Sequence, residues 1–381
     1  MSPADAPPLV RRTDLADLLR STIAQEGPIT VERFMALALG HPTFGYYMTR
    51  DPFGAAGDFT TAPEISQMFG ELLGLWAAAV WQSLGQPQRV HLVELGPGRG
   101  TLMSDALRAL RGLPALREAL DVHLVETSPV LRQMQETTLR PTRMTTTWHT
   151  SVDTLPDGPL LVLANEFFDA LPIRQFVRTG RGWCERLVGL GPDDALAFGL
   201  AAEPIDHSFA DHVQRANGTA APLGATVELC PAGFAVVESL AARICRQGGA
   251  LLAIDYGHGR SGFADTLQAV KNHQFVDPLA EPGAADLTAH VDFAALGRAA
   301  RRGGATVQGS VTQGVFLRGL GLDHRSAVLK GRATPAQSAD IEAAVARLAG
   351  PSPGMGELFK VMAVTAPGLP TLPGFETEPP Q

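Results

Sequence analysis

The chain has 381 residues, of which 45% are hydrophobic and 18% are charged, and its formal net charge is −8. This balance is typical of a globular enzyme and argues against nonspecific nucleic-acid binding, because phosphates are neutralised by basic surfaces. No apolar run approaches the roughly 20 residues that span a bilayer, so we expect no membrane insertion. Cys184, Cys230 and Cys245 are isolated, which argues against a disulfide framework or a zinc site. With an N-terminus that lacks a secretory or transit pattern, these features indicate a cytoplasmic protein.

The first 85 residues predict an N-terminal helical cap. Helices are expected over residues 15–26, 31–39 and about 63–84, the first two capped by Thr13 and Thr30. Residues 41–66 between them are rich in glycine and aromatic residues and have no periodicity. Long aperiodic segments inside a compact protein are usually functional or disordered, and the aromatic residues argue against disorder. We interpret this stretch as a lid that closes over a ligand.

From residue 89 the pattern becomes strand, turn and helix, repeated. Strands are expected at 90–95, 122–126, 144–148, 160–164 and 250–256, with closing strands at 306–308 and 358–364. The helices between them cover 101–111, a segment capped by Ser128, 233–246, and 335–348 capped by Thr334. This alternation predicts an α/β fold with a mainly parallel sheet and helices on both of its faces.

Residues 173–229 interrupt the alternation. Two strands, 173–177 and 183–188, flank the turn sequence Thr-Gly-Arg-Gly at 179–182, which predicts a hairpin. We therefore expect four parts in the chain, with the proline-rich end disordered. They are a cap and lid (1–85), a core (86–172 and 226–365), an inserted arm (173–225) and a disordered tail (366–381).

A glycine-rich loop, Glu-Leu-Gly-Pro-Gly-Arg-Gly at 94–100, directly follows the first core strand. A dinucleotide fingerprint would need glycine at 101, where Thr101 stands, and a phosphate loop would need a nearby lysine. Glu94 would repel a pyrophosphate but suits a cationic amino-acid group. Glu126 ends the second strand, where a carboxylate can accept both ribose hydroxyls. An adenosine without phosphate and with a charged amino-acid tail describes S-adenosylmethionine; plain tight turns with solvated acids are the alternative.

Five motifs in order resemble a known family: GAAGDFTTAPEISQMFGELLG (54–74), ELGPGRGTL (94–102), NEFFDALP (165–172), IDYGH (254–258) and DLTAHVDF (286–293). They are similar to the MidA-like family, which includes the mitochondrial complex I assembly-factor methyltransferase and its bacterial relatives. The resemblance runs from about residue 14 to 365. It implies a class I methyltransferase fold, with a Rossmann-like, mainly parallel seven-stranded sheet. For the mitochondrial members it also implies protein arginine methylation, so a protein substrate, such as a respiratory-complex subunit, becomes a candidate partner.

The residues expected to bind the cofactor gather in the glycine loop, at the second strand end and before the helix at 63. They are Glu94, Gly96, Pro97, Gly98, Gly100, Thr101, Glu126, Thr127, Asp58, Thr61, Pro63, Glu64 and Asn165. Asp58 and Glu64 would face the sulfonium or amino-acid end. Ordinary helix capping by Thr60 or Thr61 is the alternative interpretation of the second group.

Methyl transfer to nitrogen needs a lone pair aimed at the methyl carbon, and a guanidinium must be held by carboxylates and lose a proton. Asn165, Glu166 and Asp169 follow the fourth strand, at the edge where open sheets bind ligands. Asp255 ends the fifth strand at the same edge. We expect these four residues to be catalytic, with a surface helix start as the alternative. The sequence leaves open whether His258, Lys271 or His290 takes part.

The leading hypothesis is a methyltransferase that uses S-adenosylmethionine on a protein side chain, most simply arginine, without a metal. A small-molecule methyltransferase is the runner-up, because a fold does not fix its acceptor. A cofactor-binding assembly chaperone with little turnover is the alternative from a different class. A homodimer is a further candidate assembly.

Overall fold

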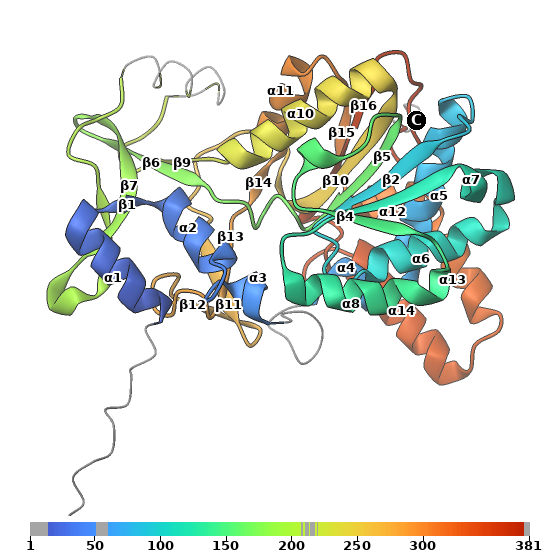
Figure 1. The fold of residues 1–381 in the computed structure, drawn as a ribbon, viewed down its shortest axis with the longest axis horizontal. Helices are drawn as coiled ribbons and strands as arrows, with labels where there is room; N and C mark the ends of the chain where they lie inside the picture. The colour runs from blue at the N-terminus through green and yellow to red at the C-terminus, as the bar shows by residue number, and fades with distance from the viewer. Residues whose placement is uncertain are drawn as a thin grey trace, which may run out of the picture.

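The computed structural model describes residues 14–50, 60–206, 209, 213, 218 and 220–376. A large central sheet with helices on both faces forms the core, and a set of smaller sheets with the first helices lies beside it (Figure 1). We call this second part the accessory unit, comprising α1–α3, β1, β6–β9 and β11–β13.

The central sheet has the strand order β4–β3–β2–β5–β10–β16–β15. Its strands are β2 (Val90–Leu95), β3 (Leu120–Val125), β4 (Thr146–His149), β5 (Leu160–Asn165), β10 (Gly249–His258), β15 (Thr306–Thr312) and β16 (Phe359–Thr365). The two-residue strand β14 (Val291–Asp292) extends the sheet beside the end of β10. Strands β4 to β10 are parallel, and β16 is antiparallel to both of its neighbours. The predicted seven-stranded, mainly parallel sheet is confirmed.

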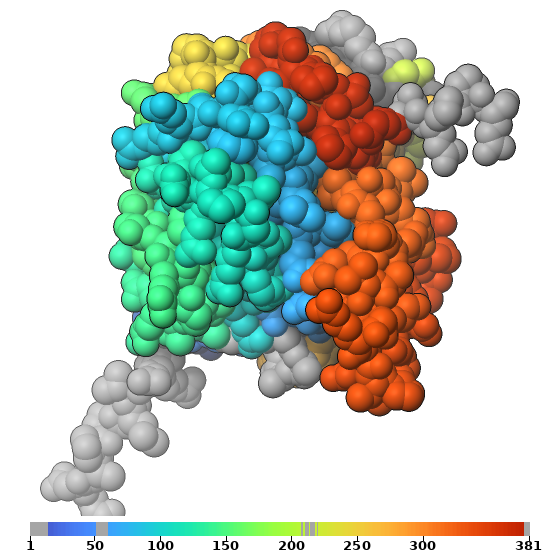
Figure 2. Space-filling model, turned by 90° about the vertical axis from the view of Figure 1, so that its right-hand side faces the viewer, coloured from blue at the N-terminus to red at the C-terminus, as the bar shows by residue number. Residues whose placement is uncertain are grey.

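Helices cover both faces of this sheet because its strands bury side chains on both sides. Val90 and Leu92 of β2 join one apolar cluster, whereas Val93 and Leu95 join the other. The first face carries α5 (Gln67–Ser83), α6 (Thr101–Ala109), α7 (Pro114–Ala119), α8 (Pro129–Leu139) and α12–α14 (Gln313–Gly319, Leu322–Lys330 and Pro335–Ala349). The opposite face carries α10 (Pro231–Gln247) and α11 (Phe293–Arg302). Figure 2 shows the first face, where α5, α6 and the orange helices α13–α14 lie together.

The helix predicted over 63–84 belongs to the core rather than to the N-terminal cap. It breaks at Ser66, whose extended backbone (φ −160°) separates α4 (Ala62–Ile65) from α5 and whose side chain caps α5. Gly70 and Gly74 allow α5 to pack closely on α6, since an added Cβ would lie 2.6 and 2.8 Å from Asp105 and Ala106. Capping by Thr30, Ser128 and Thr334 is confirmed. Asp14 caps the first helix, and Thr13 lies outside the described residues.

The accessory unit joins three separate segments of the chain. The first supplies α1 (Leu15–Glu26), β1 (Ile29–Thr30), α2 (Val31–Gly40) and α3 (Tyr46–Thr49). The second supplies β6 (Arg174–Thr179), β7 (Gly182–Leu190), β8 (Leu196–Leu200) and β9 (Thr226–Leu229), and the third supplies β11 (Gln268–Lys271), β12 (Gln274–Val276) and β13 (Asp286–Thr288). The predicted hairpin is present, with Thr179 opposite Gly182. Ile29 of β1 pairs with Val188 of β7, so the cap and the arm are one unit, and β9 and β11–β13 belong to it rather than to the core.

The proline-rich end is partly ordered, contrary to the prediction of a disordered tail from residue 366. Leu372 and Phe375 are buried, and the Phe375 ring packs against Phe316 with ring centroids 5.3 Å apart. Gln308 fixes the segment by accepting from the Leu372 amide and donating to the Pro370 carbonyl. Apolar side chains between the prolines explain the order, since they cover the end of the core. Residues 377–381 lie outside the description.

Candidate functional site

A cavity of about 750 Å³ lies between the carboxyl edge of the central sheet and the accessory unit. From the core it is lined by Glu94, Gly96, Pro97, Gly98, Arg99, Thr101, Glu126, Thr127, Asn165, Glu166, Asp169, Tyr256 and Arg347, among others. From the accessory unit it is lined by residues that include Tyr47, Gln268, Phe275, Asp286 and Thr288. Open sheets bind ligands at this edge, so the cavity is the candidate functional site.

The glycine loop brings its backbone to the cavity wall. Gly96, Gly98 and Gly100 have φ values of +58°, +52° and +81°, which side chains rarely adopt. An added Cβ at Gly96 would lie 3.0 Å from the Phe167 ring, so this position is also closely packed. Gly100 does not line the cavity, and it begins α6 beneath the loop. Between Pro97 and Arg99, which also line the cavity, the glycines leave positions where a ligand can approach the backbone closely.

Glu94, at the end of β2, presents a carboxylate to the cavity. The residue is only 3% exposed, and its Oε2 atom has no hydrogen-bond partner among the described residues. Burial raises the pKa of Glu94 well above its ordinary value, because the charged form is poorly solvated. An unpartnered buried carboxylate oxygen is stabilised by a cation. Glu94 thus fits a ligand with a charged amino group.

Glu126, at the end of β3, is held by its neighbours. Its Oε1 accepts from the Ser128 amide at 2.7 Å and its Oε2 accepts from Gln135 Nε2 at 3.0 Å. Gln135 Nε2 also donates to the Gly98 carbonyl at 2.8 Å. A carboxylate offers about four acceptor positions, so capacity remains for two hydroxyl donors. Gln135 is a positioning residue that the sequence analysis missed, because a buried glutamine in a helix carries no sequence signal.

The residues before α5 connect to the glycine loop. Glu64 accepts from Thr101 Oγ1 at 2.6 Å and from Arg99 at 3.5 Å, which ties α4 to the start of α6. Thr61, Pro63 and Glu64 all line the cavity. Thr61 makes no side-chain capping bond to α4. Asp58 lies outside the described residues, as do the other residues of 51–59 in the segment interpreted as a lid.

Glu166 follows β5 in a conformation that is uncommon for a side-chain-bearing residue. Its φ is +50°, in the left-handed region, which non-glycine residues occupy mainly in turns and functional sites. Its Oε1 accepts from the Ala62 amide at 3.0 Å and from Asn165 Nδ2 at 3.2 Å. Enclosure in the cavity raises the pKa of Glu166 to about 8. The acid is therefore fixed at the cavity wall and is close to titration near neutral pH.

Asp169 lies on the loop after β5. Its Oδ2 accepts from the Tyr256 hydroxyl at 2.6 Å, while its Oδ1 has no partner in the described part of the chain. The residue is 6% exposed, and burial raises its pKa to about 6. Asp255 stands behind this loop and does not line the cavity. Its Oδ2 accepts from the amides of Phe168 and Asp169 at 3.0 and 3.2 Å, so it positions the loop, contrary to our expectation that it holds an acceptor.

The accessory wall of the cavity was missed by sequence analysis. In the motif at 286–293, Asp286–Thr288 form β13, whereas Asp292 caps α11 by accepting from the Ala295 amide at 2.8 Å. Tyr47 donates to Asp286 Oδ1 at 2.7 Å. The alternation of DLT was the available signal, since it places Asp286 and Thr288 on one face of a strand.

The three residues that the sequence left open lie at different places. His290 lines the large cavity, and its pKa is lowered first by burial and then by the neighbouring His258. His258 Nδ1 lies 3.2 Å from the Val291 carbonyl oxygen. Lys271 is paired with Glu281 and does not line the large cavity. Of the three, only His290 therefore borders the space that a substrate could occupy.

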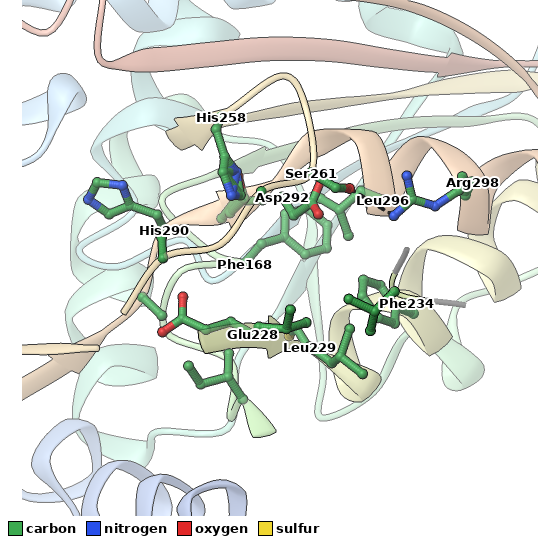
Figure 3. A pocket seen from close by; sticks show the side chains of 18 residues that line it. Phe168, Glu228, Leu229, Phe234, His258, Ser261, His290, Asp292, Leu296 and Arg298 are labelled. Carbon is green, nitrogen blue, oxygen red and sulfur yellow. Dashed lines mark hydrogen bonds between the residues drawn. The ribbon is translucent and has the colours of Figure 1, made fainter. Parts of the chain in front are cut away.

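A second, smaller cavity of about 60 Å³ lies between β9 and the start of α11 (Figure 3). Phe168, Glu228 and His258 line it, and Arg298 donates to Ser261 Oγ at 2.9 Å at its edge. In Figure 3 the His290 ring points away from the other labelled side chains. The volume holds one or two water molecules rather than a substrate.

Comparison with known proteins identifies the family. A family model described as a putative S-adenosyl-L-methionine-dependent methyltransferase matches residues 72–311. The chain belongs to this methyltransferase family. The match begins within α5 and ends within β15, so it includes the glycine loop, Glu126 and the acids after β5.

Relatives of this methyltransferase include the mitochondrial protein arginine methyltransferases NDUFAF7. The Danio rerio protein is 39% identical over 370 residues, covering 91% of this chain and 85% of the relative. The Homo sapiens protein is 39% identical over 333 residues, covering 81% and 73%. A COG1565 superfamily member from Burkholderia thailandensis, crystallised with S-adenosyl-homocysteine bound, is 30% identical with a TM-score of 0.80, and the match covers 94% of this chain and 93% of that one. The family match shows that this protein depends on S-adenosylmethionine, and the structural match shows that it has the class I methyltransferase fold.

The cavity of this methyltransferase fits the cofactor. The unpartnered oxygen of Glu94 suits its amino group, Glu126 suits the ribose hydroxyls, and the glycines of the loop allow a close approach of the ligand to the backbone. In the part of the chain that the structure describes, no group of three or more histidine, cysteine, aspartate or glutamate side chains is arranged to hold a metal ion. No helix of that part has the length and apolar character needed to cross a membrane.

Proposed function

We propose that this methyltransferase modifies the guanidinium group of an arginine in a partner protein. One observation carries the proposal: Asp169 lines the cofactor cavity, and its buried Oδ1 atom has no partner among the described residues. A buried carboxylate in this state is stabilised by a cationic donor, and a guanidinium supplies donors in the plane of a carboxylate. The names of the NDUFAF7 relatives, protein arginine methyltransferases, support the same acceptor.

The chemistry divides between the two carboxylates after β5. When bound, the cofactor supplies a methyl group from a sulfonium, and the electrons of the broken bond stay on sulfur. Asp169, whose pKa is about 6, is ionised near neutral pH and holds the guanidinium. Glu166, whose pKa is about 8, becomes ionised as the cation arrives, because an opposite charge favours the carboxylate form. As the nitrogen–carbon bond forms, Glu166 accepts the one proton that the attacking nitrogen loses, and the product is a methylated guanidinium that keeps its single positive charge.

Arg347 lines the cavity and its positive charge lowers the pKa of Glu166, although burial has the larger opposite effect. Asn165 donates to the Glu166 carboxylate at 3.2 Å and keeps its own Oδ1 without a partner in the described residues. The backbone of Glu166 is fixed by its amide, which donates to the Ile254 carbonyl at 2.9 Å. These contacts orient the base before the acceptor enters, which lowers the entropy lost on reaching the reactive geometry.

The test begins with transfer of labelled methyl from S-adenosylmethionine into a cell lysate, followed by mapping of the methylated residue. Glu166→Gln and Asp169→Asn keep shape and hydrogen bonding but remove the charge. Each should reduce methyl transfer to the labelled protein by at least about a hundredfold, while calorimetric titration finds cofactor affinity within a fewfold of wild type. Glu136→Gln, an exposed glutamate on α8, is the matched control and should change neither quantity.

Three outcomes would redirect the assignment. Label found only in small molecules favours a small-molecule methyltransferase, and cofactor binding without any transfer favours an assembly chaperone. Unchanged transfer in both amide variants removes Glu166 and Asp169 from the mechanism. A respiratory-complex subunit as partner, a homodimer and a cytoplasmic location stay predictions, and the named relatives are described as mitochondrial.

A further inference from the structure

A second buried acid faces the cavity from the accessory unit. Asp286 on β13 is 4% exposed and lines the same cavity as Asp169. The Tyr47 hydroxyl donates to its Oδ1 at 2.7 Å. Burial raises the pKa of Tyr47 well above its ordinary value, and the negative charges of Asp286 and Asp169 both add to this effect. One phenol therefore lies in the field of both carboxylates, which places the two acids in one part of the cavity.

The two acids are fixed to each other through the backbone. The Ala289 amide donates to the Asp169 carbonyl at 3.0 Å, so the end of β13 is bonded to the loop that carries Asp169. Asp286 and Thr288 share one face of β13, because side chains alternate along a strand. Thr288 Oγ1 accepts from Gln268 Nε2 at 3.2 Å, and both residues line the cavity. The accessory wall is thus a polar surface held at a set position beside Asp169.

A tyrosine hydroxyl donates to each of the two acids. The Tyr256 hydroxyl donates to Asp169 Oδ2 at 2.6 Å, and the Tyr47 hydroxyl donates to Asp286 Oδ1 at 2.7 Å. Asp169 forms no ion pair with a lysine or arginine of the described residues, and its Oδ1 is buried without a partner. A planar group with several donors on its edges can contact two carboxylates at once, whereas an ammonium is a compact point charge.

We propose that Asp286 is the second carboxylate of the acceptor subsite, and that the guanidinium of the substrate arginine lies between Asp286 and Asp169. Asp286 binds and selects the acceptor, and Tyr47 positions Asp286. The inference rests on the proposed function, because it assumes a guanidinium acceptor. It assigns acceptor selection to the accessory unit, while the central sheet holds the cofactor.

The test measures binding without turnover. Nα-acetyl-arginine methylamide and its lysine counterpart are titrated into the full chain saturated with S-adenosyl-homocysteine, with binding followed by NMR. Wild type should bind the arginine probe at least about tenfold more tightly than the lysine probe. Asp286→Asn should weaken arginine-probe binding by roughly tenfold or more and remove most of this preference, as expected when one charge-assisted contact is lost. Its affinity for S-adenosyl-homocysteine should stay within a fewfold of wild type.

Tyr47→Phe keeps the charge of the Asp286 carboxylate and serves as a second variant should Asp286→Asn fail to fold. It should weaken binding of the arginine probe by a smaller factor than Asp286→Asn. Glu281→Gln, on the outer surface of the accessory unit, is the control and should bind as wild type. The role of Asp286 is overturned if folded Asp286→Asn, or Tyr47→Phe, binds the arginine probe with wild-type affinity while Asp169→Asn loses that affinity. This outcome leaves the proposed function standing. A wild-type protein that does not distinguish the two probes overturns the guanidinium acceptor itself.

Discussion

The side chain of Gln135 joins the two cofactor elements of the site, since one nitrogen donates to Glu126 at 3.0 Å and to the Gly98 carbonyl at 2.8 Å. Its amide oxygen accepts from Trp148 Nε1 at 2.8 Å, which fixes the orientation of the amide. The end of β3 and the glycine loop therefore keep their spacing through a residue that does not line the cavity.

Replacing Gln135 by alanine should weaken cofactor binding by about tenfold, because the loss of a hydrogen bond to a charged group costs roughly 1.5 kcal/mol or more. Isothermal titration with S-adenosylmethionine measures the change. Gln133→Ala, at an exposed position of the same helix, should bind as wild type. Equal affinity in the two variants would show that Glu126 keeps its position without Gln135.

Removal of the Glu126 carboxylate should weaken the binding of S-adenosylmethionine and of S-adenosyl-homocysteine by similar factors, because both ligands carry the same ribose. A charge-assisted hydrogen bond contributes about 1.5–3 kcal/mol, which predicts a roughly ten- to hundredfold rise in Kd for Glu126→Ala. Calorimetric titration of both ligands is the measurement. A loss confined to one ligand would argue against a ribose contact.

Gly98→Val should abolish cofactor binding and leave the fold intact. The φ of +52° at Gly98 is unfavourable for a β-branched residue, and Gly98 lines the cavity in which the cofactor binds. We expect a loss of at least about a hundredfold in affinity, with an unchanged circular dichroism spectrum. Gly180→Val, at an exposed turn where an added Cβ meets open space, is the matched control. A near-wild-type affinity of Gly98→Val for the cofactor would contradict the placement of the cofactor at this loop.

Glu166 should make the ligand-free protein less stable as pH rises. The pKa of Glu166 is raised from an ordinary value of 4.5 to about 8, so between these values the folded state holds a proton that the unfolded state has lost. The wild-type free energy of unfolding should therefore fall, relative to that of Glu166→Gln, by no more than about 1.4 kcal/mol per pH unit in this window. Urea unfolding of both proteins at pH 5.5 and pH 8 measures the difference. A constant difference across the window would show that Glu166 titrates near its ordinary value.

A chain of three histidines across β2, β3 and β4 predicts the opposite dependence at lower pH. His123 lies 3.2 Å from His91 and 3.0 Å from His149 between ring nitrogens, and burial lowers its pKa to about 4. In the unfolded state His123 binds a proton near pH 6.5, whereas in the folded state it binds one only near pH 4. The free energy of unfolding should therefore fall as pH decreases through this window. Unfolding at pH 7 and pH 4.5 should show a smaller decrease for His123→Gln than for wild type. An equal decrease would assign the acid sensitivity to other groups.

The core and the cofactor side of the site could be predicted because their signals are local. The inner strands of the sheet are short, mainly apolar runs, and the cofactor residues lie at or directly after the strand ends. The rule that ligands bind at the carboxyl edge of such a sheet was enough to predict Glu94 and Glu126 as cofactor-binding residues. The helix caps at Thr30, Ser128 and Thr334 were equally readable.

The acceptor side could not be predicted because its contacts join distant segments. Tyr47 and Asp286 are separated by 239 residues in sequence, and β1 is only two residues long where it pairs with β7. Periodicity carries no information on such pairing. Asp255 was misjudged for a related reason: its position at a strand end suggested a ligand contact, whereas its carboxylate is used by backbone amides behind the loop.

The placement of β16 affects how the chain is completed during synthesis. This strand comes last in sequence, yet it lies between β10 and β15, and β15 joins the sheet only through it. Until residues 359–365 leave the ribosome, β10 has an unpaired edge and β15 has no strand to pair with. Exposed strand edges are sites of aggregation, so a nascent chain that stalls before Phe359 needs protection by a chaperone. The central sheet is therefore completed in one late step, when β16 pairs with β10 and β15.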